Sequence, residues 1–347
     1  MDVFLTGGSG FAGAAIIRKL VADGHVVHGL ARSSRAAEAV AAAGALPVRG
    51  DLEELVEHDE ADSGVRRPSL GAGWVDVLGK VDAVVHAAAL MAFWGPDELF
   101  IDRNLRPALA LYRAAVAAKV KRFVLLSAAS VSTGGNDASV VDEISDTGRP
   151  NIAYSRIKLR TEQEMLSQPH EDTALVILRP PFLWGRGMNL RGFIDTVEAG
   201  RFSWIDEGRH TIDFCHVENL AHAAALALTR GEHGLVCYVT DDSPRAVREF
   251  FTPLLATQGI DVSKAASYPR AIASPLATLM QTLARARRSA TAPPLTQWII
   301  SFMGRDRAYD ITRARTALGY TPAVTVDEGL RQMTETPTPG QQAGGTA

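Results

Sequence analysis

The sequence predicts an α/β fold with a doubly wound parallel sheet and a small C-terminal lobe. Three observations predict it. Short, continuously apolar runs rich in β-branched residues recur through the first half of the chain, alanine-rich stretches separate them, and the alternation becomes irregular from Pro180 onward. Continuous apolar strands separated by helices are typical of a parallel sheet covered on both faces. The irregular second half then indicates a smaller lobe beside the sheet.

The individual elements follow in order along the chain. Strands are expected at residues 3–5, 25–31, 47–49, 81–89, 122–128 and 174–180, and helices at residues 14–22, 35–43, 104–118 and 155–166. The alanine runs are helix formers, and the second helix ends at Gly44, a residue type that favours a helix C-terminus. The charged stretch 53–73 contains glycine and proline, so we interpret it as a surface insertion. The tail 334–347 is predicted to be disordered.

Composition excludes several classes of protein. The chain has 347 residues, of which 46% are hydrophobic and 22% charged, and its formal net charge of −3 argues against a nucleic-acid binder. Cys215 and Cys237 lack metal-ligand spacing, so we predict two buried thiols, no metal and a reducing, cytoplasmic location. The opening residues indicate a strand and not a signal peptide. The most apolar late stretch, 271–284, is too short to span a bilayer.

A glycine-rich turn follows the first predicted strand. In TGGSGFAG, Gly7, Gly10 and Gly13 recur at a spacing of three, and an amphipathic helix follows. Such glycines permit a tight turn, let the backbone approach a pyrophosphate and let helix pack on strand, while the diphosphate binds free N–H groups at the helix N-terminus. The context predicts a Rossmann-type dinucleotide site. Its expected contacts are Gly7, Gly10, Phe11, Ala12 and Gly13.

The second predicted strand ends without the acid that NAD-binding units use to hold the ribose 2′-hydroxyl. Arg32 follows directly, and Ser33, Ser34 and Arg35 add further donors. A guanidinium can pair with the 2′-phosphate of NADP, which an acid would repel. We therefore predict a preference for NADP(H) over NAD(H), with Arg32 and Arg35 at the 2′-phosphate. Asp51, after the third strand, is expected near the adenine.

Tyr154 and Lys158 lie one helical turn apart in YSRIK and share a helix face. The segment follows the fifth strand and opens a helix at the carboxyl edge of the predicted sheet. A free tyrosine has a pKa of about 10, which a nearby ammonium and an oxidised nicotinamide would lower. Tyr154 is therefore predicted to exchange a proton with a substrate oxygen. Lys158 is predicted to assist it and to hold the nicotinamide ribose.

These motifs together resemble the extended short-chain dehydrogenase/reductase superfamily, most of all its epimerase/dehydratase-like and 3β-hydroxysteroid-dehydrogenase-like members. The resemblance rests on TGGSGFAG, RGDL, VVHAAA, YSRIK, RPPFLWGRG and DFCHVENLA, and it covers nearly the whole chain. It implies hydride transfer at the nicotinamide, with Tyr154 as acid/base and Lys158 as its helper. Further cofactor contacts are expected at Leu52, Ala87, Ala88, Ala89 and Pro181.

The same resemblance divides the chain into two parts. Residues 1–179, with 210–240 returning, are expected to form the NADP(H)-binding domain, and residues 180–209 and 241–333 the substrate lobe. Extended members often dimerise through the helices that follow the fourth and fifth strands. A homodimer is therefore expected for this chain.

One position departs from the family pattern. The family usually has a catalytic Ser or Thr at the end of the fifth strand, where this chain has Ala128. Ser127 and Ser130 are the candidate replacements. If the chain stays extended, Ser130 shares the face of Ala128 and Ser127 points the opposite way, so Ser130 is slightly favoured.

The substrate pocket is predicted to be apolar. Phe182 stands after the sixth strand, where nucleotide-sugar members often carry an Asn that helps hold the diphosphate. Phe93, Trp94, Trp184 and Trp204 are expected to add apolar surface. Four cations could instead supply a diphosphate site, namely Arg186, Arg191, Arg201 and Arg209.

Three functions are compatible with these observations. The leading one is an NADP(H)-dependent oxidoreductase acting on a hydrophobic ketone, aldehyde or secondary alcohol, steroid-like ones included. The second is a nucleotide-sugar epimerase or dehydratase that uses its cofactor internally, and Phe182 and Arg32 count against it. The third is a non-catalytic NADP(H) sensor, which Ala128 allows and the Tyr154–Lys158 pair opposes. The apolar stretch 276–283 could close the pocket or form an interaction surface.

Overall fold

The computed structural model describes residues 1–56, 73–133, 139–145, 147–287, 289 and 291–335. Most of the predicted insertion 53–73 and of the predicted disordered tail 334–347 lies outside the described residues, so both interpretations stay predictions.

A seven-stranded parallel sheet forms the centre of the molecule, in the order β12-β7-β5-β4-β1-β2-β3. Its strands are β1 (Asp2–Thr6), β2 (Val26–Ala31), β3 (Leu46–Arg49), β4 (Ala83–His86), β5 (Arg122–Leu126), β7 (Ala174–Arg179) and β12 (Leu235–Tyr238). In β1, Val3 pairs with Val27 of β2 and with Ala83 of β4. The strand order reverses at this place, and ligands of open α/β sheets bind in the crevice at the carboxyl ends of such strands.

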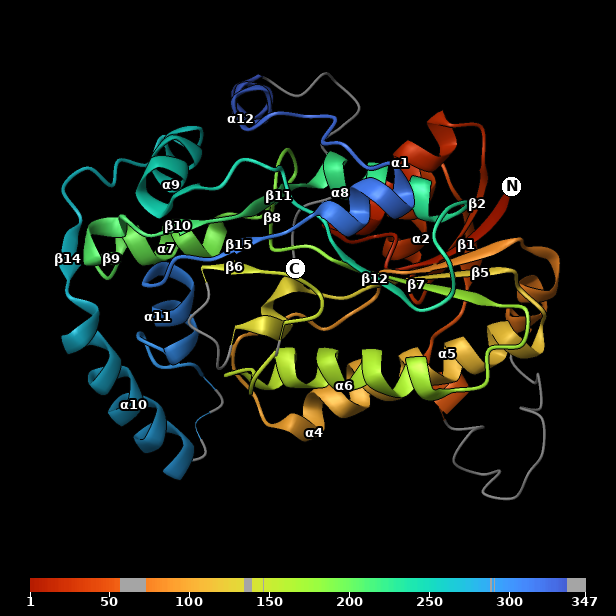
Figure 1. Ribbon diagram of the computed structural model, residues 1–347, viewed down its shortest axis with the longest axis horizontal. Helices are drawn as coiled ribbons and strands as arrows, with labels where there is room; N and C mark the ends of the chain where they lie inside the picture. The colour runs from red at the N-terminus through yellow and green to blue at the C-terminus, as the bar shows by residue number, and fades with distance from the viewer. Residues whose placement is uncertain (57–72, 134–138, 146, 288, 290, 336–347) are drawn as a thin grey trace.

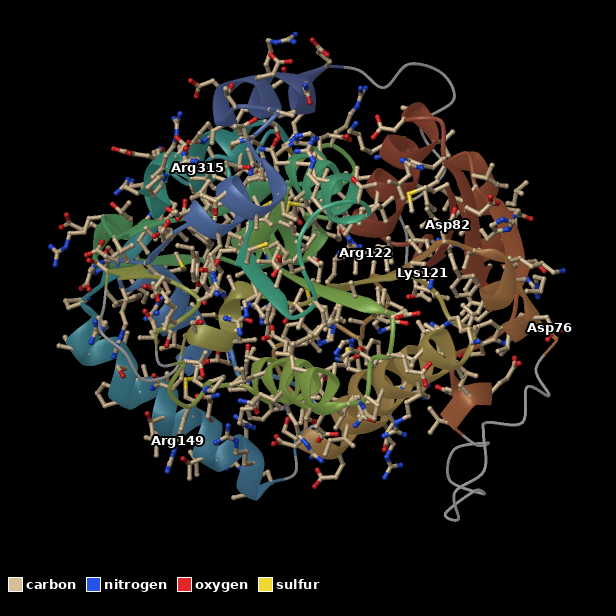
Figure 2. The ribbon with its side chains drawn as sticks, turned by 45° about the vertical axis from the view of Figure 1, so that its right-hand side comes forward. Asp76, Asp82, Lys121, Arg122, Arg149 and Arg315 are labelled. Carbon is tan, nitrogen blue, oxygen red and sulfur yellow. The ribbon has the colours of Figure 1, made fainter. Side chains whose placement is uncertain are left out.

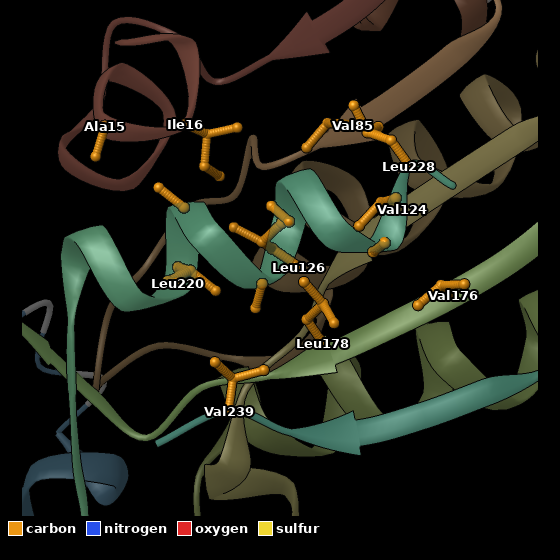
Figure 3. Close-up of a cluster of buried hydrophobic side chains, with 14 of the residues drawn as sticks. Ala15, Ile16, Val85, Val124, Leu126, Val176, Leu178, Leu220, Leu228 and Val239 are labelled. Atoms are coloured by element: carbon orange, nitrogen blue, oxygen red, sulfur yellow. The ribbon is translucent and has the colours of Figure 1, made fainter. Parts of the chain in front are cut away.

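Helices cover both faces of the sheet (Figure 1). On one face lie α1 (Phe11–Ala22), α2 (Ser34–Ala42) and α8 (Val217–Ala227), and on the other α4 (Asp97–Phe100), α5 (Arg106–Ala117) and α6 (Ala153–Ser167). Figure 3 shows Leu220 and Leu228 from α8 and its C-cap beside apolar side chains of β4, β5 and β7. The predicted doubly wound α/β fold is confirmed.

The chain leaves the sheet after β7 and later returns to it. Helix α8 packs on α1, and β12 adds to the sheet edge beside β7, where Leu235 pairs with Val176. Between β7 and α8 the chain forms β8 (Phe182–Trp184), α7 (Arg191–Glu198), β9 (Ser203–Ile205), β10 (Thr211–Ile212) and β11 (Phe214–His216).

The elements after β12 complete a second core. They are β13 (Arg245–Ala246), α9 (Val247–Ala256), β14 (Ala266–Tyr268), α10 (Arg270–Ala286), α11 (Gln297–Met303), β15 (Ala308–Tyr309) and α12 (Val326–Thr334). Short strands join distant segments, with β8 beside β11, β9 beside β14, β10 beside β13, and β15 beside β6 (Val140–Val141). The rings of Phe214 and Phe250 stack 3.5 Å apart in this core. We call the elements from β8 to β11 and from β13 to α12, which share this core, the lobe. The exact boundaries of the two predicted domains stay a prediction.

The amino ends of the strands are fixed by polar contacts of their own. The Asp2 amide donates to the Asp82 carboxylate at 2.9 Å, and the Arg122 guanidinium donates to the Gly231 carbonyl at 2.6 Å. Figure 2 labels Asp82, Lys121 and Arg122 in this region, and the Lys121 amide donates to the Asp82 carbonyl at 3.2 Å. No helix of the described part of the chain is long and apolar enough to cross a bilayer.

Candidate active site

The glycine turn after β1 is packed too tightly for side chains at two of its three positions. Gly7 has a φ of +76°, and a Cβ there would lie 2.6 Å from the backbone nitrogen of Ala88. A Cβ at Gly13 would lie 2.1 Å from the Gly7 carbonyl oxygen. At Gly10, by contrast, a Cβ would meet just that carbonyl oxygen, at 3.3 Å, among the described residues beyond its chain neighbours and its own helix. The turn is therefore closed towards the protein and open outward at Gly10, which fits the approach of a diphosphate.

Helix α1 begins beside this opening. Gly10 is its N-cap, no side chain of the described residues caps the helix, and its first turn contains no acidic residue. The first N–H groups of a helix have no partner within it and carry a partial positive charge. Phe11 and Ala12, in this first turn, are half-buried. The predicted diphosphate contacts thus lie together around one helix N-terminus.

Arg32 and Asp51 come from neighbouring strand ends. Arg32 is exposed directly after β2, and Arg35 is exposed in the first turn of α2. The Ser33 hydroxyl caps the N-terminus of α2 and accepts a hydrogen bond from the Ala36 amide at 3.1 Å. Asp51 follows β3, and its carboxylate accepts from the Glu53 amide at 3.1 Å. Two exposed arginines therefore lie at the end of β2, where the adenosine ribose of a dinucleotide lies in this fold.

The loop after β4 is held on both sides. The Thr6 hydroxyl bonds to His86 Nδ1 at 2.8 Å and accepts from the Ala88 amide at 3.3 Å. The Asn104 side chain accepts from the Leu90 amide at 2.7 Å and donates to the Leu90 carbonyl at 3.0 Å. The backbone at residues 87–89, predicted to line the cofactor, is thereby fixed next to Gly7.

His86 makes the fold sensitive to acid. Burial, with a smaller contribution from the Lys158 ammonium, lowers the pKa of His86 from 6.5 to about 3. Below pH 6.5 the unfolded chain takes up a proton at this residue and the folded chain does not, so stability is complete above 6.5 and falls as the pH falls towards 3. Between pH 7.5 and pH 5, His86 is expected to lower the free energy of unfolding by about 2 kcal/mol.

Urea unfolding at these two pH values measures the effect. His86→Gln is expected to reduce the difference between them by about 2 kcal/mol, whatever it does to stability at pH 7.5. His28→Gln, at a part-buried histidine paired with Asp2, is the matched control. An equal acid loss in the wild type and in His86→Gln would show that other groups cause it.

Tyr154 and Lys158 lie in the first turns of α6, as predicted, and both are buried. The Lys158 ammonium donates to the Leu126 carbonyl, at the end of β5, at 2.8 Å. Burial lowers the pKa of Lys158 to about 8 against the opposing charge of Glu162, and burial raises the pKa of Tyr154 to about 12. The expected lowering of the phenol pKa is thus not found in the chain alone, because burial raises it. The prediction also relied on the positive charge of an oxidised nicotinamide, which would lower the phenol pKa only when the cofactor is bound.

The two candidate serines occupy different surroundings. Ser127 is buried and its hydroxyl bonds to the Glu162 carboxylate. Ser130 is half-buried, and its hydroxyl accepts from Ser155, the neighbour of Tyr154, at 2.7 Å. The chain does not stay extended here, because residues 129–132 form a 3₁₀ turn. The parity argument therefore fails, but after the turn Ser130 is the candidate serine whose hydroxyl bonds to the first turn of α6.

A buried ion pair behind Lys158 is missing from the sequence predictions. The Glu162 carboxylate accepts from the Arg179 guanidinium at 2.5 Å, and their side chains are only 1% and 7% exposed. Burial opposes ionisation of Arg179, but Glu162 outweighs it and raises the pKa of Arg179. Arg179 also donates to the Tyr238 hydroxyl at 3.4 Å. The spacing of Lys158 and Glu162, four residues apart on one helix, is the signal that could have indicated the contact.

Four aromatic rings form a row between the loop after β4 and the lobe. Phe93 stacks on Trp298 at 3.8 Å, Trp298 on Phe302 at 5.2 Å, and Phe302 contacts Phe182 at 5.7 Å. We call Phe93, Trp298, Phe302 and Phe182 the aromatic row. None of the four rings is fully buried, and Phe93 is 40% exposed. The sequence predictions contained Phe93 and Phe182 but missed the two rings of α11 between them.

The aromatic row is tied to the start of α6. Asn151, three residues before Tyr154, donates to the Gln297 carbonyl at 3.2 Å and to the Ser301 hydroxyl at 2.8 Å. Trp298 packs against the core cluster that includes Tyr154. The Trp94 indole turns towards another segment and donates to the Ser289 carbonyl at 3.0 Å.

Trp184 and Trp204 do not lie in this row. Both indoles are fully buried in the core of the lobe, so the expectation that they line a substrate pocket does not fit the structure. Trp184 donates to the Asp241 carboxylate at 2.7 Å and packs on His216. Large apolar rings contribute to cores as readily as to pockets, and here the lobe uses them for its own packing.

The two cysteines are buried, and burial raises the pKa of both thiols. Within the described ranges, no group of three His, Cys, Asp or Glu side chains is placed to hold a metal ion. Pro181, the last predicted cofactor contact, is half-buried two residues after the end of β7.

Comparison with known proteins agrees with this geometry. The NAD dependent epimerase/dehydratase family matches residues 3–239. A ketoreductase of Stigmatella aurantiaca, named for 4-hydroxy-2-methyl-3-oxo-4-farnesyl-3,4-dihydroquinoline-1-oxide, is 33% identical over 99% of this chain and 98% of its own. A 2-alkyl-3-oxoalkanoate reductase of Stenotrophomonas maltophilia is 28% identical over 96% and 98%. The UDP-glucose 4-epimerase of Thermotoga maritima, solved with UDP-glucose, superposes with a TM-score of 0.68 at 20% identity and covers 96% of this chain and 97% of its own.

The epimerase therefore shares the fold, while the two reductases are similar in sequence from end to end. The chain belongs to the NAD-dependent epimerase/dehydratase family, within the extended short-chain dehydrogenase/reductase superfamily, and is an NAD(P)-dependent oxidoreductase.

Proposed function

We propose that the protein is an NADP(H)-dependent reductase or dehydrogenase of a hydrophobic ketone, aldehyde or secondary alcohol. The observation that carries the proposal is the aromatic row beside the buried Tyr154–Lys158 pair, joined to it through Asn151. Apolar pockets with a few polar groups are typical of sites for small hydrophobic ligands. The names of the two reductase relatives point to the same class of chemistry, a ketone on an apolar molecule.

Different residues of the site would bind the cofactor and transfer the proton. The glycine turn and the first amides of α1 would hold the diphosphate, the backbone at 87–89 and Pro181 would line the nicotinamide side, and Asp51 and Leu52 the adenine side. The cofactor, when bound, supplies or accepts the hydride. A phenol with a pKa of about 12 is protonated at neutral pH, which is the form that protonates a carbonyl oxygen during reduction. Ser130 would donate a hydrogen bond to the same oxygen.

An apolar substrate also fits the state of the arginines that could have bound a diphosphate. Arg191 pairs with Asp195 within α7 at 3.2 Å, and Arg186 donates to the Glu335 carbonyl at 3.5 Å. Phe182 contacts Phe193, Phe214 and Phe251 as well as the aromatic row. Phe182, after β7, thus offers a substrate apolar contacts in place of the side-chain amide of an Asn.

Arg32 is proposed to select NADP(H). Removing the guanidinium in Arg32→Ala would delete a charge-assisted hydrogen bond to the 2′-phosphate, so the KM for NADPH is expected to rise roughly 10- to 100-fold while the KM for NADH stays the same. Initial rates with both cofactors measure this. Arg160→Ala removes an exposed arginine from α6 and is the control. Equal effects on both cofactors, or a wild type that prefers NADH, would contradict the assignment.

The reaction itself is tested by NADPH oxidation with a panel of apolar ketones and aldehydes. Net consumption of NADPH in equal amount to alcohol formed supports the reductase. The family and the fold of the UDP-glucose 4-epimerase favour a second candidate, a nucleotide-sugar epimerase or dehydratase. Such an enzyme would retain oxidised cofactor through purification and turn over without net consumption.

A homodimer through α5 and α6 is part of the proposal and rests on resemblance. Most side chains of α5 are buried within the single chain, so the contact would fall chiefly on the exposed side of α6. Sedimentation velocity decides between monomer and dimer.

A further inference from the structure

Helix α10 presents an apolar stripe to solvent. Ile272, Leu276, Leu279 and Leu283 recur at spacings of four, three and four, and are 63%, 48%, 56% and 45% exposed. Residues with this spacing lie on one side of a helix. The opposite side is covered, since Ala273, Ala277 and Gln281 are buried. Figure 1 shows α10 at the outer edge of the lobe, with α11 on its inner side. Four neighbouring, exposed, large aliphatic side chains indicate an interaction surface for a protein or a membrane.

The segment that carries this stripe is strongly basic. From residue 262 to residue 305 the chain has no Asp or Glu and six cations, Lys264, Arg270, Arg285, Arg287, Arg288 and Arg305. The whole chain, by contrast, has a net charge of −3. Arg285 and Arg287 lie at the C-terminal end of α10, directly after the last leucine of the stripe. Positive charge is therefore concentrated where the apolar side chains are exposed.

We propose that α10 docks on the surface of an anionic lipid bilayer. An amphipathic helix with apolar side chains on one side and arginines beside them lies in the plane of the membrane, where aliphatic groups enter the acyl boundary and cations bind anionic headgroups. The stripe and the uninterrupted positive charge match both parts of such a surface. Tyr268, just before α10, is 52% exposed and adds an aromatic ring of the kind enriched at membrane interfaces.

A second copy of the chain fits this surface less well. A symmetric dimer contact places the same patch on both subunits. Here it would bring two basic segments together without an acidic residue in either of them to pair with the arginines. Anionic lipid supplies the opposite charge that the segment itself lacks.

The docking surface adjoins the aromatic row. The Arg285 guanidinium lies 5.7 Å from the centre of the Trp94 ring, and Trp94 bonds to Ser289, just after α10. Met91 and Phe93, in the same loop as Trp94, are 67% and 40% exposed. If the proposed function holds, a lipophilic ketone dissolved in the bilayer would reach the aromatic row without crossing water. Membrane binding itself does not depend on that function.

Vesicle co-sedimentation tests the proposal with the full chain. The wild type is expected to pellet with vesicles of equal parts phosphatidylglycerol and phosphatidylcholine, and not with phosphatidylcholine alone or in high salt. Leu276→Ser/Leu279→Ser should weaken binding on the order of 100-fold, since two leucines no longer enter the apolar layer. Arg285→Gln/Arg287→Gln should weaken it roughly 20-fold, about fivefold per cation.

Ile144→Ser is the matched control, because Ile144 is 83% exposed on another part of the chain and its loss should leave vesicle binding unchanged. Circular dichroism and thermal unfolding establish that each variant is folded. Reduction of a water-soluble ketone is measured separately, so failure of the proposed function and failure of membrane docking are distinguishable. Absence of pelleting with anionic vesicles overturns the proposal, and so does pelleting that is equal in Leu276→Ser/Leu279→Ser. A dimer that this double variant dissociates, without vesicle binding, would assign the stripe to a second copy.

Discussion

Tyr154→Phe is expected to lower kcat for carbonyl reduction roughly 10²- to 10⁴-fold, the usual contribution of a positioned acid. The substitution removes only the phenol oxygen. The ring would keep its edge contact with Phe100, at 6.2 Å between centroids, so the start of α6 and the packing behind Lys158 should be preserved. The KM for NADPH and the thermal unfolding temperature are therefore expected to stay close to those of the wild type.

Steady-state kinetics with NADPH and the best ketone of the panel give this result, and Tyr112→Phe is the control. Tyr112 is also buried, burial likewise raises its pKa to about 12, and its hydroxyl has no hydrogen-bond partner in the described part of the chain. Loss of that hydroxyl should leave activity unchanged and stability equal or slightly higher. A Tyr154→Phe variant with at least half of the wild-type kcat would remove Tyr154 from the proposed mechanism.

Glu162→Gln is expected to destabilise the protein by about 3–5 kcal/mol, because it leaves the buried Arg179 guanidinium without its counter-charge. It should also act on the site. Glu162 raises the pKa of Lys158 against the effect of burial, so its removal lowers that pKa further below 8. If the reaction requires the ammonium, the alkaline limb of the pH–rate profile moves to lower pH.

Urea unfolding and the pH dependence of kcat measure the two effects separately. Glu164→Gln is the control on the same helix, since Glu164 pairs with Arg160 at an exposed position and such pairs contribute less than about 1 kcal/mol. Glu162→Gln/Arg179→Gln should recover part of the lost stability, because no uncompensated charge remains. A shifted pH profile identifies Glu162 as a positioning residue. A loss of stability with an unmoved profile would restrict it to a structural role.

Much of the sheet could be predicted because its strands are apolar on both faces. The apolar runs of β1, β2, β5 and β7 are short and alternate with alanine-rich helices, which predicts buried strands of a parallel sheet. The end of β4 was harder to predict. The strand ends at His86, three residues before its predicted end, since three alanines carry no polar signal and the turn is fixed by Thr6 and Asn104 from elsewhere in the chain.

The site shows the same division between local and distant information. Gly7, Gly13, Tyr154 and Lys158 belong to motifs with short spacings, so the sequence alone could predict them as site residues. Whether an aromatic ring faces a pocket or a core depends on distant packing, which is why Trp184 was misassigned while Trp298 went unnoticed. The choice between Ser127 and Ser130 depends on where a strand becomes a 3₁₀ turn, and the serines and alanines around it are compatible with both conformations.

The late return of α8 to the sheet has a consequence for synthesis of the chain. On the ribosome, β1, β4, β5 and β7 are complete by residue 179, but Leu220 and Leu228, which cover one face of them, follow only after part of the lobe has been made. At roughly 5–20 residues per second, this leaves an interval of about 2 to 10 seconds. During this interval Val85, Val124 and Val176 are not yet covered by α8. The nascent chain thus exposes an apolar β-surface of the kind that chaperones shield, and a pause in translation within β8 to β11 would prolong that exposure.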